Sequence, residues 1–401
     1  MFRRSLLTLF LTLLTLPALA QQLTPEVKAR TLAALQTTIQ RRAFVPGVDF
    51  AKLPAALEKR KPELDRAETP NAFAAAVNLA LRDFGISHIR FQTPAAARQR
   101  ATGEAVGFGL AATPSDSGLT VTSLAAGSDA EKVGLKEGDA ITEIEGKKPT
   151  SPADLDQDGR ETSLLTVKRD GRTRYVMLVR KPYSTDRAAT LTWPAPGVAR
   201  IMLPNFTRSY KMAQMEGFLT EAAKAKTLIL DLRNNGGGQV NFSTHLLSLL
   251  LPPGTPIGVS VTRQIADEYT KATGKESVDP VAVAMWKGAT RKTIKGKLAP
   301  FSGKIVVLIN RRSASASEIV SSVLKEQRGA TLIGQNSAGL VLTSIFAPLE
   351  GGYAIQLPIS DFVTPKGVRL EKNPVKVDVT VEGNPAKDEA ADLAIQAALK
   401  I

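Results

Sequence analysis

The stretch that decides the fold reads KIVVLIN at residues 304–310 and continues as RRSASASEI at residues 311–319. The first run is apolar and typical of a buried strand, and a helical pattern runs from Glu318 to Glu326, so a serine-rich turn joins a strand to a helix. At such a helix N-terminus the backbone N–H groups point outward and favour negative charge, and the alanines beside Ser315 leave room for a carbonyl group. Acyl transfer by a serine nucleophile needs that arrangement, but a serine that only caps a surface helix has the same local sequence.

A second strand-to-loop junction lies earlier in the chain. The apolar run TLILDL at residues 227–232 is followed by RNNGGG at residues 233–238. Three glycines after a buried strand let the backbone approach a ligand closely and aim N–H groups at it. Taken alone, the same glycines are equally consistent with an ordinary tight turn.

The chain has 401 residues, 43% of them apolar, which is enough for two or three domains. Helical patterns at residues 24–85 precede short β-like runs at residues 103–183. From residue 190 onward strands and helices alternate, with a less regular region near residues 262–300 and a closing helix predicted at residues 388–399. This alternation predicts an α/β core in a chain that is α+β overall.

Composition narrows the chemistry. The chain has no cysteine and only two histidines, His88 and His245. These counts exclude thiol catalysis and cysteine-ligated zinc, and they argue against a multi-histidine metal site. We therefore expect no metal and no cofactor.

The charge balance is basic, with a formal net charge of +14. The lysines and arginines are scattered, and the aromatic residues are sparse and do not alternate with them. This distribution argues against a nucleic-acid partner and favours a solvated basic surface.

The first twenty residues are typical of a secretory signal peptide. Arg3 and Arg4 precede the apolar segment Leu6–Leu16, and the small residues of the run 18–20 form a cleavage motif. No later segment is long and apolar enough to span a bilayer. We therefore expect a protein exported to the periplasm or cell envelope, or secreted, without a transmembrane span once the signal is removed.

Residues 103–183 resemble a PDZ domain of the bacterial envelope-protease type. The resemblance rests on the element GLKEGDAI at residues 134–141 and on the loop residues Gly107, Phe108, Gly109 and Leu110. In that family the loop binds a peptide's terminal carboxylate with backbone N–H groups and adds the peptide as a strand. The alternative is a β-domain that serves only as a spacer or lid.

Residues 231–238 and 313–318 together resemble the carboxyl-terminal processing (tail-specific) proteases. The resemblance implies a crotonase-like spiral protease core with an N-terminal helical segment and an inserted PDZ β-domain. It divides the chain into a signal peptide (1–20), a helical segment (21–99), a PDZ domain (100–183) and the serine protease core (184–401).

The same resemblance implies the roles of the site residues. Ser315 is the expected nucleophile, and the backbone N–H groups of Gly238 and Ala316 are expected to form the oxyanion hole, with Gly237 shaping the loop. Ser313 and Ser317 are expected to act only as packing or helix-entry hydroxyls.

The chain departs from the Ser/Lys branch of this family. That branch carries Phe-Gly-Lys-Gly about 25 residues after its serine, whereas here the lysine position is Leu340, which takes no proton. Lys366 could substitute only from another loop. Gly85-Ile86-Ser87-His88 resembles the corresponding segment of tricorn-type relatives, which use Ser, His and Glu, so the resemblance implies His88 as base and Glu371 as the group that orients it.

Each of these residues also has a structural interpretation. His88 could be a hydrogen-bonded residue just past a helix C-terminus, and Glu371 lies between basic neighbours as a surface glutamate would. The sequence after Glu371 also differs from the family pattern, with Asn373 and Pro374 where a Gly and then Pro-Asp are usual. His245 lies in a leucine-rich helical pattern and is expected to be structural.

The leading hypothesis is an exported serine endopeptidase that cleaves polypeptides through an acyl-enzyme on Ser315, with the PDZ domain holding the substrate. The first alternative is a non-catalytic peptide-binding pseudoprotease of the cell envelope, for which Leu340 is the main argument. A third is another hydrolase on the same fold. The sequence carries no indication of the oligomeric state.

Overall fold

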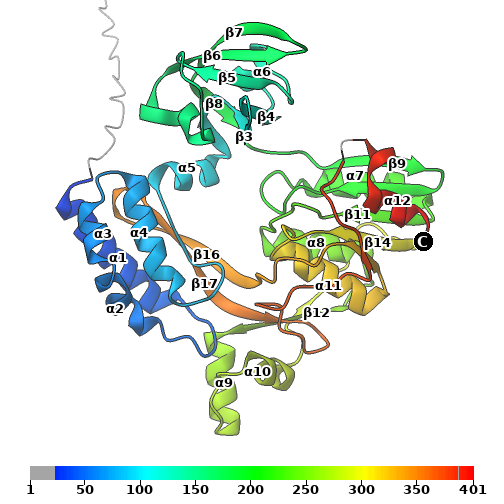
Figure 1. Ribbon diagram of the computed structural model, residues 1–401. Coiled ribbons are helices and arrows are strands. Elements are labelled where there is room, and N and C mark those ends of the chain that lie inside the picture. The colour runs from blue at the N-terminus through cyan, green and yellow to red at the C-terminus, as the bar shows by residue number, and fades with distance from the viewer. Residues whose placement is uncertain (1–22, 387) are drawn as a thin grey trace, which may run out of the picture.

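The computed structural model describes residues 23–386 and 388–401, so the predicted signal peptide at residues 1–20 lies outside the described residues. A helical arm, a small β-domain and a larger α/β body make up the molecule (Figure 1). Two long strands, β16 (Leu342–Pro348) and β17 (Ala354–Val363), run between the arm and the body.

The arm packs four α-helices over one end of β17. Thr24 and Thr69 cap its two longest helices, and in each a proline occupies the first helical position. Their apolar faces, represented by Leu35 and Phe73, share a core with the inward residues of β17. The helical segments of the arm are α1 (Pro25–Arg42), η1 (Phe50–Lys52), α2 (Leu53–Glu58), α3 (Lys61–Arg66) and α4 (Pro70–Arg82).

A connecting sheet joins the arm to the body. Its order is β1-β17-β12-β13, with β16 on the other side of β17, and all of its pairings are antiparallel. β1 (Arg90–Gln92) pairs with the arm end of β17, whereas β12 (Pro256–Thr262) pairs with the opposite end, and β13 (Arg291–Lys292) extends the sheet. The segment between α4 and β1 leads from the arm into this sheet, and a hydrogen bond from the Ser87 amide to Glu371 ties it to the α/β body.

The body is built on a six-stranded sheet of order β18-β15-β14-β11-β10-β9, parallel except for β9. The central strands are almost fully buried, so their residues are apolar on both faces. One face is covered by three α-helices and the other by α12. The strands are β9 (Thr190–Ala195), β10 (Val198–Met202), β11 (Thr227–Asp231), β14 (Lys304–Ile309), β15 (Thr331–Gly334) and β18 (Val379–Thr380); the helical segments are α7 (Met212–Glu221), η3 (Ala222–Lys224), α8 (Val240–Leu250), α11 (Ala316–Arg328), η5 (Glu389–Ala391) and α12 (Leu393–Leu399).

The β-domain has a core of its own and contacts the rest through short segments. Leu119, Ile141 and Leu165 are among its fully buried residues. The helix α5 (Pro94–Thr102) and the pair β2 (Glu104–Gly107) and β8 (Lys181–Ser184) attach it to the arm and the body. Its five-stranded antiparallel sheet and small helices are β3 (Leu110–Ser115), β4 (Gly118–Leu124), α6 (Asp129–Lys132), β5 (Ala140–Ile144), η2 (Pro152–Gly159), β6 (Thr162–Arg169) and β7 (Arg172–Val179).

Two predictions of local structure are wrong. The region near residues 262–300, expected to be irregular, contains α9 (Arg263–Thr273) and α10 (Pro280–Lys287). Thr262 and Asp279 cap these helices, so the start signals were present in the sequence. The single closing helix expected at residues 388–399 is split, because the Asp392 carboxylate caps α12 where η5 ends.

Candidate active site

Ser315 stands at the N-cap position of α11, but its hydroxyl makes no capping bond. The Oγ atom instead lies 3.1 Å from Nε2 of His88. The backbone of Ser315 has φ +57°, an uncommon conformation for a residue with a side chain, which aims the hydroxyl away from its own helix. The N-cap interpretation of this serine therefore describes its position but not its hydrogen bonding.

A buried carboxylate, Glu318, anchors the backbone around Ser315. It accepts hydrogen bonds from the Ser315 amide at 2.9 Å, the Ser337 hydroxyl at 2.5 Å, and the Gly339 and Leu340 amides at 2.7 and 3.0 Å. Burial raises the pKa of Glu318, and these four donors oppose that rise. The loop at residues 337–340 is thereby tied to the start of α11. Our sequence interpretation missed this role, although the Ser-x-x-Glu spacing was its signal.

His88 approaches Ser315 from the segment between α4 and β1. Its Nδ1 lies 2.7 Å from the Ser87 hydroxyl, and that hydroxyl donates to Oε2 of Glu371 at 2.8 Å. Because the Ser87 proton is directed at the carboxylate, the Ser87 oxygen is left to accept from Nδ1–H. The Nε2 lone pair then faces Ser315, which is the tautomer that a general base requires.

The protonation state of His88 suits the same role. Burial lowers the pKa of His88 below its usual 6.5, and the charge of Glu371 acts in the opposite direction. The net lowering leaves the imidazole neutral near neutral pH, so it can receive a proton.

Glu371 is buried and is not bonded directly to the imidazole. It accepts from the Ser87 amide at 2.8 Å, from the Ser87 hydroxyl, and from the Val341 amide at 2.9 Å. It therefore reaches His88 only through Ser87, a residue to which we had assigned no role. We refer below to Glu371, Ser87, His88 and Ser315 as the hydrogen-bonded chain.

The glycine loop lies against the serine turn so closely that side chains cannot fit. A Cβ atom on Gly237 would lie 2.7 Å from both the Ala314 carbonyl oxygen and the Ser315 Cβ. One on Gly238 would lie 2.2 Å from the Phe206 carbonyl oxygen. Both glycines also have φ values, +92° and +147°, that disfavour other residues.

Two backbone amides beside Ser315 are available for a ligand. The Gly237 amide donates to the Asn235 side chain at 2.9 Å. Within the part of the chain that the structure describes, the amides of Gly238 and Ala316 donate to no protein acceptor. Unpaired amides next to a serine hydroxyl are what an oxyanion hole requires.

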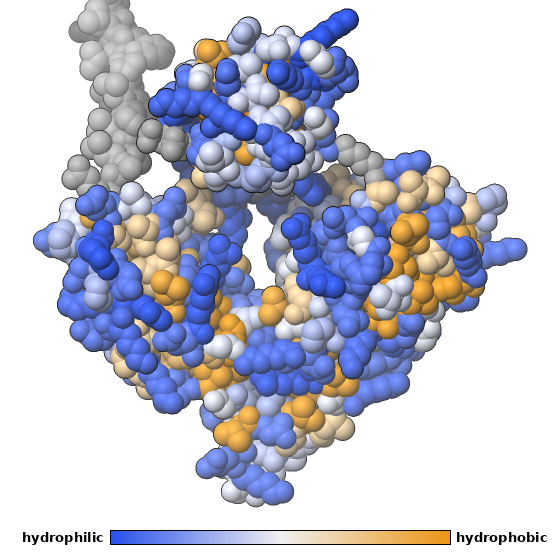
Figure 2. All heavy atoms as spheres, viewed as in Figure 1, coloured by the Kyte–Doolittle hydropathy of each residue, from blue (hydrophilic) through white to orange (hydrophobic). Residues whose placement is uncertain are grey.

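These groups open into a cavity of about 1060 Å³. His88, Ser315 and the glycine loop form one wall, and α5, β16 and the loop at residues 205–208 complete it. Figure 2 shows the hollow at the centre of the molecule, between the arm, the β-domain and the body.

Neither of the two positions considered for a lysine base places a lysine side chain at Ser315. Position 340 is a leucine whose side chain is 44% exposed, while its backbone carbonyl accepts from the Ser315 amide at 3.1 Å. Lys366 is exposed, and its amide donates to Glu326, ten residues into α11 and thus about 15 Å along the helix from its start. His245 is also elsewhere, bonded to Tyr210 at 2.8 Å and to Glu216 at 3.3 Å.

The predicted peptide-binding loop of the β-domain lies at the start of β3. Phe108 is buried in the domain core, and Gly109 has φ +77° and passes so close to Ser128 that a Cβ would collide with it. β3, which begins at Leu110, is an edge strand of its sheet, and η2 lies beside it. An edge strand next to a short helix is an arrangement to which an extended peptide can add.

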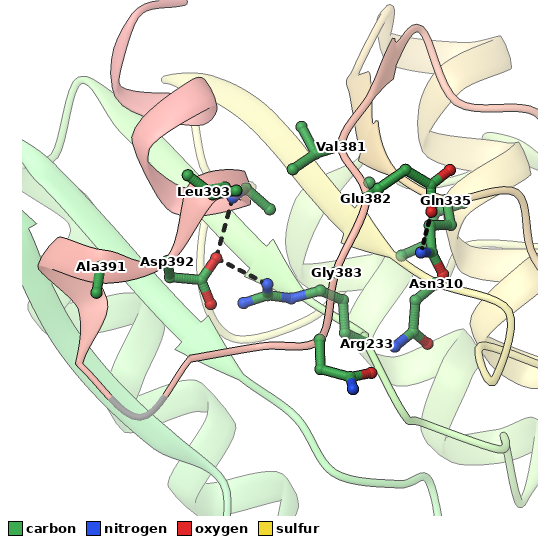
Figure 3. A pocket seen from close by; sticks show the side chains of 13 residues that line it. Arg233, Asn310, Gln335, Val381, Glu382, Gly383, Ala391, Asp392 and Leu393 are labelled. Atoms are coloured by element: carbon green, nitrogen blue, oxygen red, sulfur yellow. Dashed lines mark hydrogen bonds and ion pairs between the residues drawn. The ribbon is translucent and has the colours of Figure 1, made fainter.

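A second pocket, of about 130 Å³, is lined by Arg233 and Asn310 among others and contains neither His88 nor Ser315 (Figure 3). There Arg233 is bonded to Asp231 at 2.7 Å and to Asp392 at 2.8 Å. Burial opposes the charge of this guanidinium, but the two aspartates keep the pKa of Arg233 above its ordinary value. The ion cluster braces the base of the glycine loop.

Among the described residues, no group of three or more His, Cys, Asp or Glu side chains is placed to hold a metal ion. In the same part of the chain, no helix combines the length and the apolar character needed to cross a membrane.

Comparison with known proteins identifies the family. A model of peptidase family S41 matches residues 197–381, and a model of the PDZ domain matches residues 96–158. The α/β body belongs to peptidase family S41. By that match the chain is a serine peptidase, and its β-domain is the PDZ domain.

Individual relatives agree with this assignment. The chain is 27% identical to the chloroplastic C-terminal processing peptidase of Tetradesmus obliquus, over 85% of this chain and 75% of that protein. It is 28% identical to the carboxyl-terminal-processing protease of Synechocystis sp. (strain ATCC 27184 / PCC 6803 / Kazusa), over 70% of this chain and 64% of that protein. The fold is similar to that of mature CPAF, with a TM-score of 0.53 at 15% identity, covering 88% of this chain and 93% of that one.

Proposed function

We propose that this S41 peptidase cleaves polypeptides by acyl transfer to Ser315, with His88 rather than a lysine as the general base. The observation that carries the proposal is the 3.1 Å separation between His88 Nε2 and Ser315 Oγ. That distance is within the range in which a base can take a proton from the nucleophile directly.

In the proposed first step, the Ser315 oxygen attacks a substrate carbonyl and passes its proton to His88 Nε2. The Nδ1–H remains bonded to the Ser87 oxygen, so the ring keeps its orientation as it becomes charged. Glu371 stabilises that charge from the far side of Ser87. Ser87 and Glu371 are positioning residues in this scheme, because they act through the imidazole.

The tetrahedral oxyanion would be bound by the amides of Gly238 and Ala316. Both donors are fixed by the structure before substrate binds, so little reorganisation is required. Collapse of the intermediate returns the proton from Nε2 to the leaving amine and leaves an acyl-enzyme. Water, activated by the same imidazole, then hydrolyses the ester and restores Ser315.

We propose that the PDZ domain binds a segment of the substrate beside β3. An extended chain would pair with the free edge of that strand, and the turn at residues 107–110 would receive a terminal carboxylate through backbone amides. This places substrate capture in a different domain from bond cleavage.

The non-catalytic alternative rests on the missing lysine. Leu340 does not leave an empty base position, because its backbone contributes to the Glu318 anchor while its side chain faces solvent. The position facing the Ser315 hydroxyl is occupied by an imidazole. A loss of lysine therefore does not by itself imply a loss of activity.

We also propose that the protein is exported, on the basis of the signal pattern at residues 1–20. Sequencing the N-terminus of the protein recovered from the cell envelope or the medium tests this. A mature chain that starts at Gln21 is expected, and a chain that retains Arg3 and Arg4 in the cytoplasm would contradict it.

The proposed activity is tested with fluorescein-labelled casein as an unfolded polypeptide and with a fluorophosphonate that labels activated serines. We expect the unaltered protein to cleave casein and to become labelled, and Ser315→Ala to do neither while unfolding at the same temperature. Ser321→Ala is the matched control, since its hydroxyl bonds only to a carbonyl within the same helix. Casein cleavage by Ser315→Ala would refute the assignment.

Two other outcomes would identify the alternatives. A folded protein that neither cleaves casein nor reacts with the fluorophosphonate would be the pseudoprotease. A protein that is labelled at Ser315 but cleaves no polypeptide would be another hydrolase.

A further inference from the structure

Arg100 of α5 lies on the wall of the same cavity that contains Ser315 and His88. Its guanidinium carbon stands 3.9 Å from the centre of the Phe346 ring on β16. Its Nε donates to the Gln92 side chain at 3.2 Å. Stacking and one hydrogen bond thus hold the guanidinium in place. Its other N–H groups are available to donate to a ligand.

The charges of the cavity wall do not balance. Its charged side chains, apart from His88, are Arg100, Asp186 and Arg208. Asp186 is paired with Arg208 at 3.2 Å. Within the described residues Arg100 has no carboxylate partner, so the cavity carries one uncompensated positive charge.

Arg100 is an exposed residue, so its guanidinium is open to a ligand that enters the cavity. The protein atoms around it still lower the pKa of Arg100 through partial burial, which is a cost of holding this cation in the wall. An anion entering the cavity would offset that cost. A guanidinium bonds two oxygens of a carboxylate at once, and it prefers such planar anions to other partners.

We infer that Arg100 is a specificity-determining residue that binds a carboxylate of the polypeptide substrate inside the catalytic cavity. The inference rests on the proposed function, because it assumes that polypeptides enter this cavity. The carboxylate could belong to an Asp or Glu side chain or to the terminus of the chain. Both sources offer the same two oxygens to the guanidinium.

The structure limits how far this carboxylate lies from the scissile bond. Leu340, whose carbonyl bonds to the Ser315 amide, and Phe346 are six residues apart along an extended segment. Six residues of extended chain span at most about 20 Å. A substrate lying along β16 would therefore carry its carboxylate within about six residues of the cleaved bond.

The test measures binding rather than cleavage, so that it does not depend on catalysis. Short fluorescein-labelled peptides are titrated onto Ser315→Ala protein and followed by anisotropy. One series has Glu or Gln at each successive position with an amidated terminus, and a second has one sequence with a free or an amidated terminus. Each pair differs only in a carboxylate and the matching amide.

We expect at least one carboxylate peptide to bind about tenfold more tightly than its amide partner, the usual range for a charge-assisted hydrogen-bonded pair. Adding Arg100→Gln should abolish that difference, so that the carboxylate peptide binds no more tightly than its amide partner. Arg98→Gln, an exposed arginine of the same helix that does not line the cavity, should preserve the difference. The series that loses discrimination identifies the source of the carboxylate.

The inference is overturned if the Arg100→Gln protein discriminates as well as its parent, since a preference located in the PDZ domain would survive that change. It is also overturned if neither series shows a preference. Either failure leaves the proposed function intact as long as Ser315 is still labelled by the fluorophosphonate.

Discussion

Ser315 and His88 reach the same cavity by different routes. The serine turn and the glycine loop follow β14 and β11, which are adjacent parallel strands paired from Thr227–Lys304 to Asp231–Leu308. The carboxyl ends of neighbouring parallel strands meet at one edge of a sheet, so these two loops are adjacent by topology. His88, in contrast, comes from the arm. The connecting sheet and Glu371 hold it in the cavity.

Because the two halves are held in different ways, substitutions in each half should have different effects on stability and on catalysis. The serine half is braced within one body, by the four bonds to Glu318 and by the ion cluster at Arg233. The histidine half depends on Glu371, whose carboxylate bonds Ser87 on one side and Val341 on the other. Disturbing the first half should affect folding as well as chemistry, whereas disturbing the second should affect chemistry more than folding.

The largest effect is expected from removing the base. His88→Ala should lower kcat/KM for labelled casein by about 10³-fold, since a general base contributes 10²–10⁴-fold, and should leave the unfolding temperature almost unchanged. His245→Gln is the control, because this histidine lies outside the cavity and glutamine can keep its bonds. A loss of less than tenfold in His88→Ala would return His88 to a structural role.

The next effect separates the members of the hydrogen-bonded chain. Glu371→Gln and Ser87→Ala should each lower kcat/KM by about 10²-fold, and the double variant should be no worse than either single variant. This non-additivity follows if the carboxylate acts through the Ser87 hydroxyl. Multiplicative losses in the double variant would show that Glu371 acts on the imidazole independently.

Glu318→Gln tests the serine half of the site, where we expect a loss of stability. Its two carboxylate oxygens accept four donors, and a glutamine NH₂ cannot accept, so we expect a loss of about 2 kcal/mol in the free energy of unfolding. Urea denaturation measures this, with Glu371→Gln as the paired variant. An unchanged unfolding midpoint in Glu318→Gln would remove the argument that the serine half is braced by this carboxylate.

The smallest effect is expected at position 340. Leu340→Ala and Leu340→Lys should each change kcat/KM by less than about twofold, because surface substitutions away from special features are nearly neutral and this side chain is 44% exposed. A tenfold or larger gain in Leu340→Lys would mean that the lysine is the missing base and that the unaltered protein is a pseudoprotease.

Sequence patterns could predict the serine half and only part of the histidine half. Two apolar strands, each followed by a distinctive loop, are enough to place Ser315 beside Gly237, because parallel pairing is a local consequence of strand and helix alternation. The bridge through Ser87 could not be foreseen, since it depends on which atoms of Ser87 and Glu371 meet across a long separation in the chain. The Ser-x-x-Glu spacing indicated a bond between Glu318 and the Ser315 backbone. The other partners of Glu318, at residues 337–340, come from another loop and could not be predicted.

The central claim is that a neutral imidazole activates Ser315, and the pH dependence of fluorophosphonate inactivation tests it without requiring a known substrate. The second-order rate constant should fall as pH drops through a single midpoint below 6.5, because burial lowers the pKa of His88 and only the neutral ring accepts the proton. In Glu371→Gln the midpoint should move lower still, since the charge that raises that pKa has been removed. A rate that stays low through neutral pH and rises only at the alkaline pH where lysine deprotonates would contradict the account.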